Sequence, residues 1–124
     1  MLFKTIKICS SFTFAVASIL GLSQPAKAYS CTTASYYGLG DGFHGQITAN
    51  GERFNTYSHT TAHPYLPFGT RLRVTNNRNG RSVIVRVNDR GPYYGGRGLD
   101  LSYAAFSKIA SASNGVVSVC YSRV

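Results

Sequence analysis

The run from Ser82 to Pro92, SVIVRVNDRGP, constrains the fold most strongly because it joins a β-strand to a turn that carries a carboxylate. Three valines recur at every second position and so share one face of the strand: Val83, Val85 and Val87. Asp89 continues this parity, so its side chain is expected to point towards the apolar side at the strand end. The Arg-Gly-Pro that follows ends the strand, because proline has no N–H to donate and glycine tolerates a tight turn.

A carboxyl group at such a strand end would be partly shielded from water and open on one side. Desolvation favours the neutral form of a carboxylic acid, which is the form that a general acid needs near neutral pH. The sequence therefore predicts Asp89 as a candidate general acid. A structural role, in which Asp89 accepts backbone hydrogen bonds and shapes the turn, is commoner for aspartate and stays open.

The first 28 residues have the pattern of a secretory signal peptide. Lys4 and Lys7 give a positive start, Ile8–Leu22 is largely apolar, and Ala26-Lys27-Ala28 is an A-x-A cleavage site. A retained membrane anchor would need an apolar run of roughly 20 residues. We expect a signal peptide at 1–28 and one small domain at 29–124 that is secreted or periplasmic, without a stable membrane anchor after cleavage near Ala28.

Cys31 and Cys120 lie near the two ends of that domain. In an oxidising compartment an isolated pair is most simply a disulfide, and two free thiols are the alternative. Closing a loop of this length would restrict the unfolded chain by roughly 4–5 kcal/mol in the chain-entropy model. Such a cross-link would help a domain with a limited core.

The charge balance is basic and the acids are few. Without the three lysines of the first segment, ten Lys and Arg stand against four acids, a net charge of +6. Acidic glycans or phospholipid head groups suit such a surface in an exported protein better than nucleic acid does, although the charges are spread singly, as on an ordinary solvated surface. Any carboxylate chemistry must use some of the four acids, which are Asp41, Glu52, Asp89 and Asp100.

The residue pattern predicts an all-β core with one helical insert. Strands are expected at 33–37, 71–76, 81–88 and 116–121, a hairpin turn at 77–80, and a short helix from 103 to about 110 with Ser102 as its cap. Two Gly-rich loops, 38–45 and 93–98, carry aromatic side chains, and such rings can stack on sugars. Neither metal nor cofactor is expected: Pro64 argues against a helical zinc pair of His59 and His63, and the first loop lacks phosphate-loop spacing.

Six motifs occur in order along the domain and together are specific. They are Gly38 with Phe43–Gly45, Thr48–Phe54, Ala62-His63 with Leu66–Thr70, Val74–Asn76 with Asn79–Arg81, Val87–Pro92, and Asp100–Ser102. In these the chain resembles the rare lipoprotein A (RlpA) family of bacterial septal lytic transglycosylases. The resemblance implies a mainly β fold, a six-stranded double-psi β-barrel with one or two short helices, shared with expansins and barwin-like proteins. Closure of the barrel would remove exposed sheet edges.

The resemblance also implies a reaction and its residues. The enzyme would cleave the MurNAc–GlcNAc β-1,4 bond of peptidoglycan glycan strands, preferably free of stem peptides, and leave 1,6-anhydro-MurNAc ends. Asp89 would be the acid and then the base, Glu52 the second carboxylate, and His63 would orient a carboxylate or the sugar; exchanging the roles of Asp89 and Glu52 is nearly as plausible. Candidate substrate-binding residues are Tyr36, Tyr37, His44, Asn88, Arg90 and Tyr93.

Two features depart from better-known members. We expect neither a lipoprotein anchor nor the C-terminal peptidoglycan-binding domain that many members carry, so the resemblance does not extend to septal targeting; a monomer is expected. Two other functions stay open. One is an expansin-like module that binds or loosens wall polysaccharide without cutting it, and the other is a secreted inhibitor or defence protein of barwin type.

Overall fold

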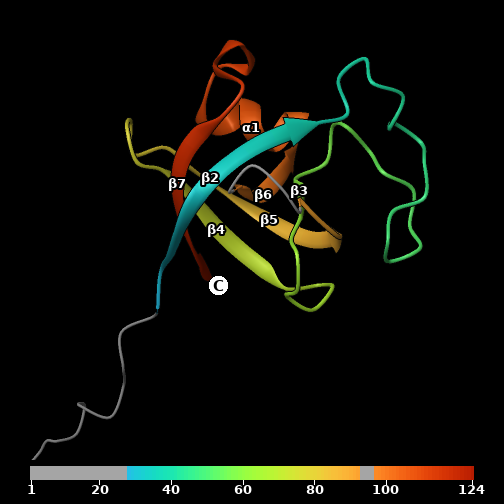
Figure 1. Ribbon diagram of the computed structural model, residues 1–124, viewed down its shortest axis with the longest axis horizontal. Helices are drawn as coiled ribbons and strands as arrows, with labels where there is room; N and C mark the ends of the chain where they lie inside the picture. Colours follow the sequence, from blue (N-terminus) through green and yellow to red (C-terminus); the bar gives the residue numbers. More distant parts are fainter. Residues whose placement is uncertain (1–27, 93–96) are drawn as a thin grey trace, which may run out of the picture.

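The computed structural model describes residues 28–92 and 97–124, and these form a closed six-stranded barrel (Figure 1). The predicted signal peptide, apart from Ala28, and Tyr93 lie outside the described residues. Around the barrel the strands follow the order β2-β6-β3-β5-β4-β7. Their bounds are β2 Ser30–Tyr37, β3 Thr60–Ala62, β4 Arg71–Asn76, β5 Ser82–Asp89, β6 Arg97–Ser102 and β7 Val117–Arg123.

The barrel mixes parallel and antiparallel pairs. β2 runs parallel to β6 and β3 parallel to β5, while the other four pairs are antiparallel. The β4–β5 hairpin predicted from the sequence is present, and Gly80 N–H donates to the carbonyl of Asn76 to close its turn at 2.9 Å. The expected mainly β, six-stranded barrel is confirmed.

The core fills the barrel with alternating side chains of the strands. As the period-two pattern predicted, the valines of β5 point inward, together with apolar residues of the other strands and of the helix. Fully buried members are Leu72, Val74, Val85, Val87, Leu99, Leu101, Val119, Phe106 and Ile109.

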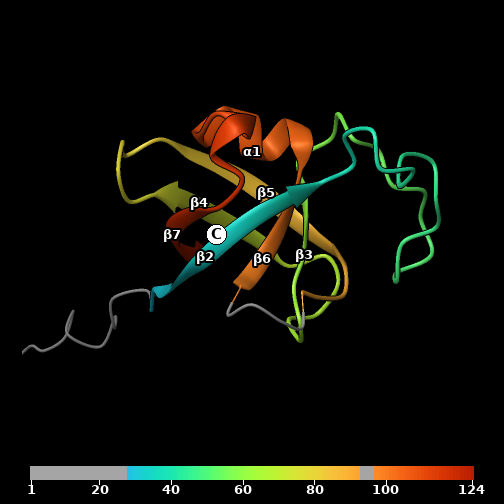
Figure 2. The ribbon, with the colours of Figure 1, turned by 45° about the horizontal axis from the view of Figure 1, so that its top comes forward.

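One short helix, α1 (Tyr103–Ile109), lies against β5, β6 and β2 (Figure 2). Ser102 is its N-cap, as predicted, and its hydroxyl accepts a hydrogen bond from Ala105 N–H at 3.3 Å. A 3-10 turn, η4 (Ala112–Asn114), connects the helix to β7. Phe106 and Ile109 bury their side chains against the barrel and fix α1 there.

Two strands were not predicted from their own residues. β3 has only three residues, and β6 begins inside the segment expected to be a Gly-rich loop. The glycine of β6 has a packing reason: a Cβ on Gly98 would lie 2.6 Å from Thr32 Oγ1 of the paired strand β2. Gly98 therefore marks a close approach of two strands, which a sequence pattern cannot distinguish from a loop.

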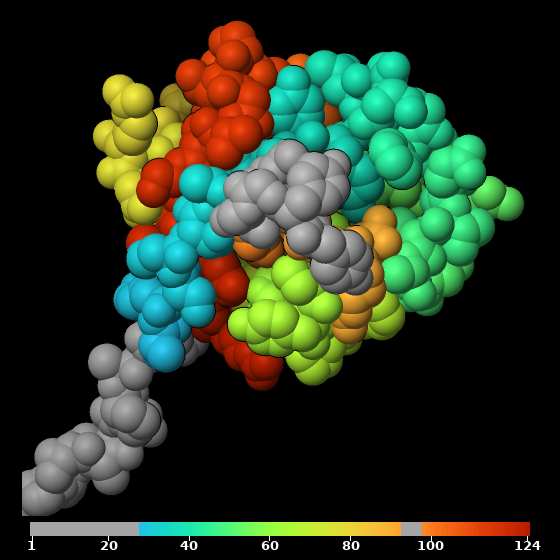
Figure 3. Space-filling model, in the orientation of Figure 1, coloured from blue at the N-terminus to red at the C-terminus, as the bar shows by residue number. Residues whose placement is uncertain are grey.

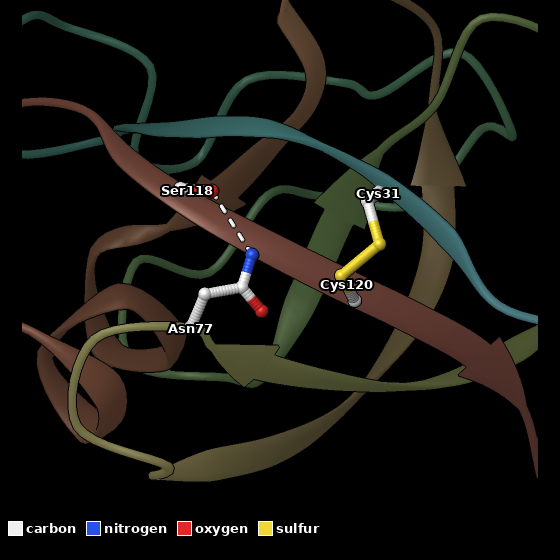
Figure 4. Close-up of a disulfide and its surroundings, with 4 residues drawn as sticks. All are labelled: Cys31, Asn77, Ser118 and Cys120. Carbon is white, nitrogen blue, oxygen red and sulfur yellow. Dashed lines mark hydrogen bonds between the residues drawn. A yellow bond between two sulfur atoms is a disulfide. The ribbon is translucent and has the colours of Figure 1, made fainter.

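The disulfide predicted between Cys31 and Cys120 is confirmed (Figure 4). The two residues lie opposite each other in the antiparallel β2–β7 pair. At the opposite edge of β7, next to β4, Asn77 Nδ2 donates to Ser118 Oγ at 2.9 Å. The cross-link therefore ties the first strand of the barrel to the last. Within residues 28–92 and 97–124, no helix is long and apolar enough to cross a bilayer.

Candidate active site

Asp89 lies half-buried at the end of β5 and accepts hydrogen bonds from three segments. The Tyr37 hydroxyl donates to Oδ2, and the backbone N–H groups of Ala49 and Arg90 donate to Oδ1, each at 3.0 Å. Burial, followed by the nearby Asp89 charge, raises the pKa of Tyr37, so its hydroxyl stays protonated and remains a donor. The backbone contacts are those of the structural interpretation, and the half-buried position is the one the candidate acid requires.

The ring of Tyr37 is held between two phenylalanines. Phe54 stacks on it with ring centroids 4.4 Å apart, and Phe43 meets it edge to face at 5.5 Å. Phe54 also packs so tightly against Gly38 that a Cβ there would lie 2.4 Å from Phe54 Cε2. This packing directs the Tyr37 hydroxyl at Asp89.

Glu52 is held as a charged carboxylate on the outside of β5. Arg86 Nη1 and Nη2 donate to its two oxygens, both at 2.8 Å, and Asn50 and Asn88 add amide donors at 2.8 and 3.1 Å. The hydrogen bonds from Arg86, with those from the two amides, lower the pKa of Glu52 to about 2. Near neutral pH this carboxylate is ionised and suits charge stabilisation better than proton donation.

The turn at 48–52 contacts both carboxylates. Ala49 N–H binds Asp89, while the Asn50 side chain binds Glu52 and the Asn50 N–H donates to the carbonyl of Asn88 at 3.2 Å. The sequence analysis named Glu52 but missed Asn50 and Arg86 as its partners. The available signal was parity: Arg86 and Asn88 are two apart in β5 and so share a face.

Asn88 connects β5 to this carboxylate. Its side chain is 1% exposed, and Nδ2 donates to Glu52. Within the described part of the chain, its Oδ1 has no hydrogen-bond partner. An unpaired buried acceptor of this kind is uncommon in folded proteins.

His63 lies in the interior, 1% exposed. Its Nδ1 accepts from the backbone N–H groups of Tyr65 and Leu66, both at 3.1 Å, and Nε2 lies 2.9 Å from the Tyr121 hydroxyl. Burial, with a contribution from the Arg90 charge, lowers the pKa of His63 and keeps the imidazole neutral. The link to Asp89 is through the backbone, where His63 N–H donates to the Asp89 carbonyl at 3.1 Å.

Of the remaining residues predicted to bind substrate, some lie near the two carboxylates and others lie elsewhere on the barrel. The Arg90 guanidinium lies 3.9 Å from the centroid of the Phe68 ring and donates to the His63 carbonyl at 3.3 Å. His44 is exposed on the long loop after β2. Tyr36 points to the other face of β2, where its ring packs 4.8 Å from that of Phe106 and its hydroxyl donates to a carbonyl of η4. The structure thus brings the side chains of Tyr37 and Asn88 to the carboxylates, whereas Arg90 reaches Asp89 only through its backbone N–H and Tyr36 packs with the helix.

Among the described residues, no three His, Cys, Asp or Glu side chains lie close enough together to bind a metal ion.

Residues 29–121 match the family model described as lytic transglycolase. The chain is 59% identical over 86 residues to a probable endolytic peptidoglycan transglycosylase RlpA of a Nostoc species, covering 69% of this chain and 23% of that protein. It is 54% identical over 95 residues to the endolytic peptidoglycan transglycosylase RlpA of Pseudomonas aeruginosa, covering 76% and 27%. The chain thus spans about a quarter of the length of these relatives.

Solved structures share the fold. A Streptomyces papain inhibitor matches with a TM-score of 0.63 at 26% identity, over 78% of this chain and 94% of that one. The expansin of Clavibacter michiganensis matches with a TM-score of 0.63 at 24% identity, over 78% and 50%. The similarity to the expansin concerns the fold alone.

Proposed function

The chain belongs to the lytic transglycolase family, and we propose that it is an exported peptidoglycan lytic transglycosylase. The bond cleaved is the MurNAc–GlcNAc β-1,4 linkage of peptide-free glycan strands, and the product carries a 1,6-anhydro-MurNAc end. The observation that carries this proposal is the contrast between the two carboxylates. Glu52 is held ionised by Arg86, so Asp89 is the carboxyl assigned to proton transfer.

In the proposed reaction Asp89 protonates the glycosidic oxygen that leaves with GlcNAc. Positive charge develops at C1 of MurNAc and is stabilised by ionised Glu52. The C6 hydroxyl of the same MurNAc then attacks C1 and gives its proton to Asp89, which restores the acid without consuming water. Tyr37 and the Ala49 N–H are positioning groups, because they fix the carboxyl of Asp89 during both transfers.

His63 and Arg90 support the site in this proposal. Neutral His63 anchors the segment after β3 through the amides of Tyr65 and Leu66. Arg90, held against Phe68 and the His63 carbonyl, fixes the turn after Asp89 and donates its backbone N–H to the Asp89 carboxyl. Both act through the geometry of the loop rather than by proton transfer.

The test is product analysis. Residues 29–124 are incubated with peptide-free peptidoglycan strands, and soluble fragments are identified by mass spectrometry. Anhydromuramic ends are expected from the parent and from Arg73→Gln, a control change at an exposed side chain of β4, and not from Asp89→Asn. Reducing-ended products would instead identify a glycosidase, and undiminished product from Asp89→Asn would refute the assignment of the acid.

An expansin-like module that binds wall polysaccharide without cutting it is the second candidate, favoured by exposed aromatic side chains such as those of Phe43 and Tyr57. It predicts that the protein is retained on insoluble wall while no soluble product forms. Asp89→Asn would then leave every effect on the wall unchanged.

Export is part of the proposal. The disulfide between β2 and β7 is of a kind that persists in oxidising compartments, and the predicted signal peptide would direct the chain there. Detection of the mature chain beginning near Tyr29 in the cell envelope or medium would test it.

A further inference from the structure

The loop from residue 38 to 59 projects from the barrel beyond the end of β2 (Figures 1 and 3). It carries Glu52 on the side facing β5, yet it also exposes rings that neither carboxylate uses. Phe43 is 49% exposed and Tyr57 is 72% exposed. These exposed rings therefore lie on the same loop that contacts Asp89 through the Ala49 N–H.

One of these rings, that of Phe43, is linked to Asp89 through Tyr37. The Phe43 ring touches Tyr37, whose hydroxyl donates to Asp89. His44 follows Phe43 in the chain, and its ring meets that of Tyr57 edge to face at 5.8 Å. We propose that Phe43, His44 and Tyr57 form an aromatic strip that binds the pyranose rings of a glycan strand on one side of the cleaved bond.

The strip is rigidly held, which lowers the ordering cost of binding. Asp41 accepts from the N–H groups of Gly38 and Phe43 at 2.7 and 3.1 Å, and this fixes the turn before the strip. The Thr56 N–H and hydroxyl lie 3.2 and 3.1 Å from His44 Nδ1. That contact orients the imidazole and leaves the Nε2 side of its ring for a sugar hydroxyl or an N-acetyl group.

The occupant follows from the chemistry and from continuity with the carboxylate pair. A pyranose presents a C–H face that packs on an aromatic ring and hydroxyls that reach a neighbouring polar group. The inference rests on the proposed function for the identity of the glycan. It differs from that function in predicting binding by residues that play no part in the chemistry.

Binding is measured in the Asp89→Asn protein, so that cleavage does not contribute. The probe is insoluble peptide-free peptidoglycan, and bound protein is separated by sedimentation. Adding Phe43→Ala or Tyr57→Ala is expected to raise the apparent Kd by about three- to tenfold each. Phe43→Tyr, which retains the ring, is expected to bind like its parent.

The matched control is Tyr29→Ala, because Tyr29 is 69% exposed but precedes β2, outside the loop that carries the strip. It is expected to leave the Kd unchanged. In cleavage assays of the protein with intact Asp89, Tyr57→Ala is expected to raise KM with little change in kcat. Equal losses from Tyr29→Ala and Tyr57→Ala, or unchanged binding by both strip variants, would overturn the inference. If the strip variants bind more weakly but the protein with intact Asp89 cleaves nothing, only the proposed reaction is overturned.

Discussion

Replacing both Cys31 and Cys120 by serine is expected to lower the free energy of unfolding by about 4–5 kcal/mol. The two cysteines are separated by 89 positions, so the reduced chain regains the freedom of a long loop, and the chain-entropy relation converts that loop into about 4.6 kcal/mol at 25 °C. A small domain has a total stability of only about 5–15 kcal/mol. The cross-link between β2 and β7 would then supply a large share of it.

The assay is urea unfolding followed by circular dichroism, with and without reductant. The reduced parent and the double serine variant should share one midpoint, well below that of the oxidised parent, and reductant should not affect the variant. The melting temperature should fall by about 20–35 °C, since 1 kcal/mol shifts the melting temperature of a domain of this size by about 4–8 °C. A loss below about 1 kcal/mol would refute the loop-closure reasoning. It would mean that strand hydrogen bonds and core packing, rather than the disulfide, hold the terminal strands in place.

Three further outcomes are expected. Arg86 lowers the pKa of Glu52, so this pair contributes stability that is present above pH 4.5 and is lost as the pH falls towards 2. In Glu52→Gln, the free energy of unfolding in urea should therefore change less with pH over that window, by about 1 kcal/mol after allowance for the pair's exposure. His63 has a lowered pKa, so the unfolded chain binds its proton first and stability should fall as pH drops below 6.5; a His63→Gln protein that kept the same slope would contradict this. Tyr37→Phe keeps the ring but removes the donor to Asp89, and anhydro product should form at least about tenfold more slowly at little cost in melting temperature; an unchanged rate would remove Tyr37 from the site.

Local pattern was enough for several elements. The alternating valines of β5, the Asn-Gly turn before it and the Ser102 cap each depend on neighbours a few residues away, and all three are present as predicted. The disulfide needed only the count and placement of two cysteines in a chain expected to be exported. The complete barrel was expected only through the family resemblance, because the residues alone indicated four of its six strands.

The candidate site depended on tertiary contacts. Sequence motifs named Asp89, Glu52 and His63, but nothing local showed that Glu52 would meet Arg86, 34 positions away, or that His63 would turn inward to Tyr121. Alternation along β2 showed that Tyr36 and Tyr37 face opposite ways, yet only the closed barrel decided which of them reaches Asp89.

The sequence by itself therefore determined which carboxylates this domain has and where its backbone turns, since propensity and parity act over short separations. The tertiary structure alone decided that Glu52 is held ionised and which groups surround each carboxylate. The physical reason is that the ionisation of a side chain depends on the donors, charges and burial around it, and here distant segments supply most of these.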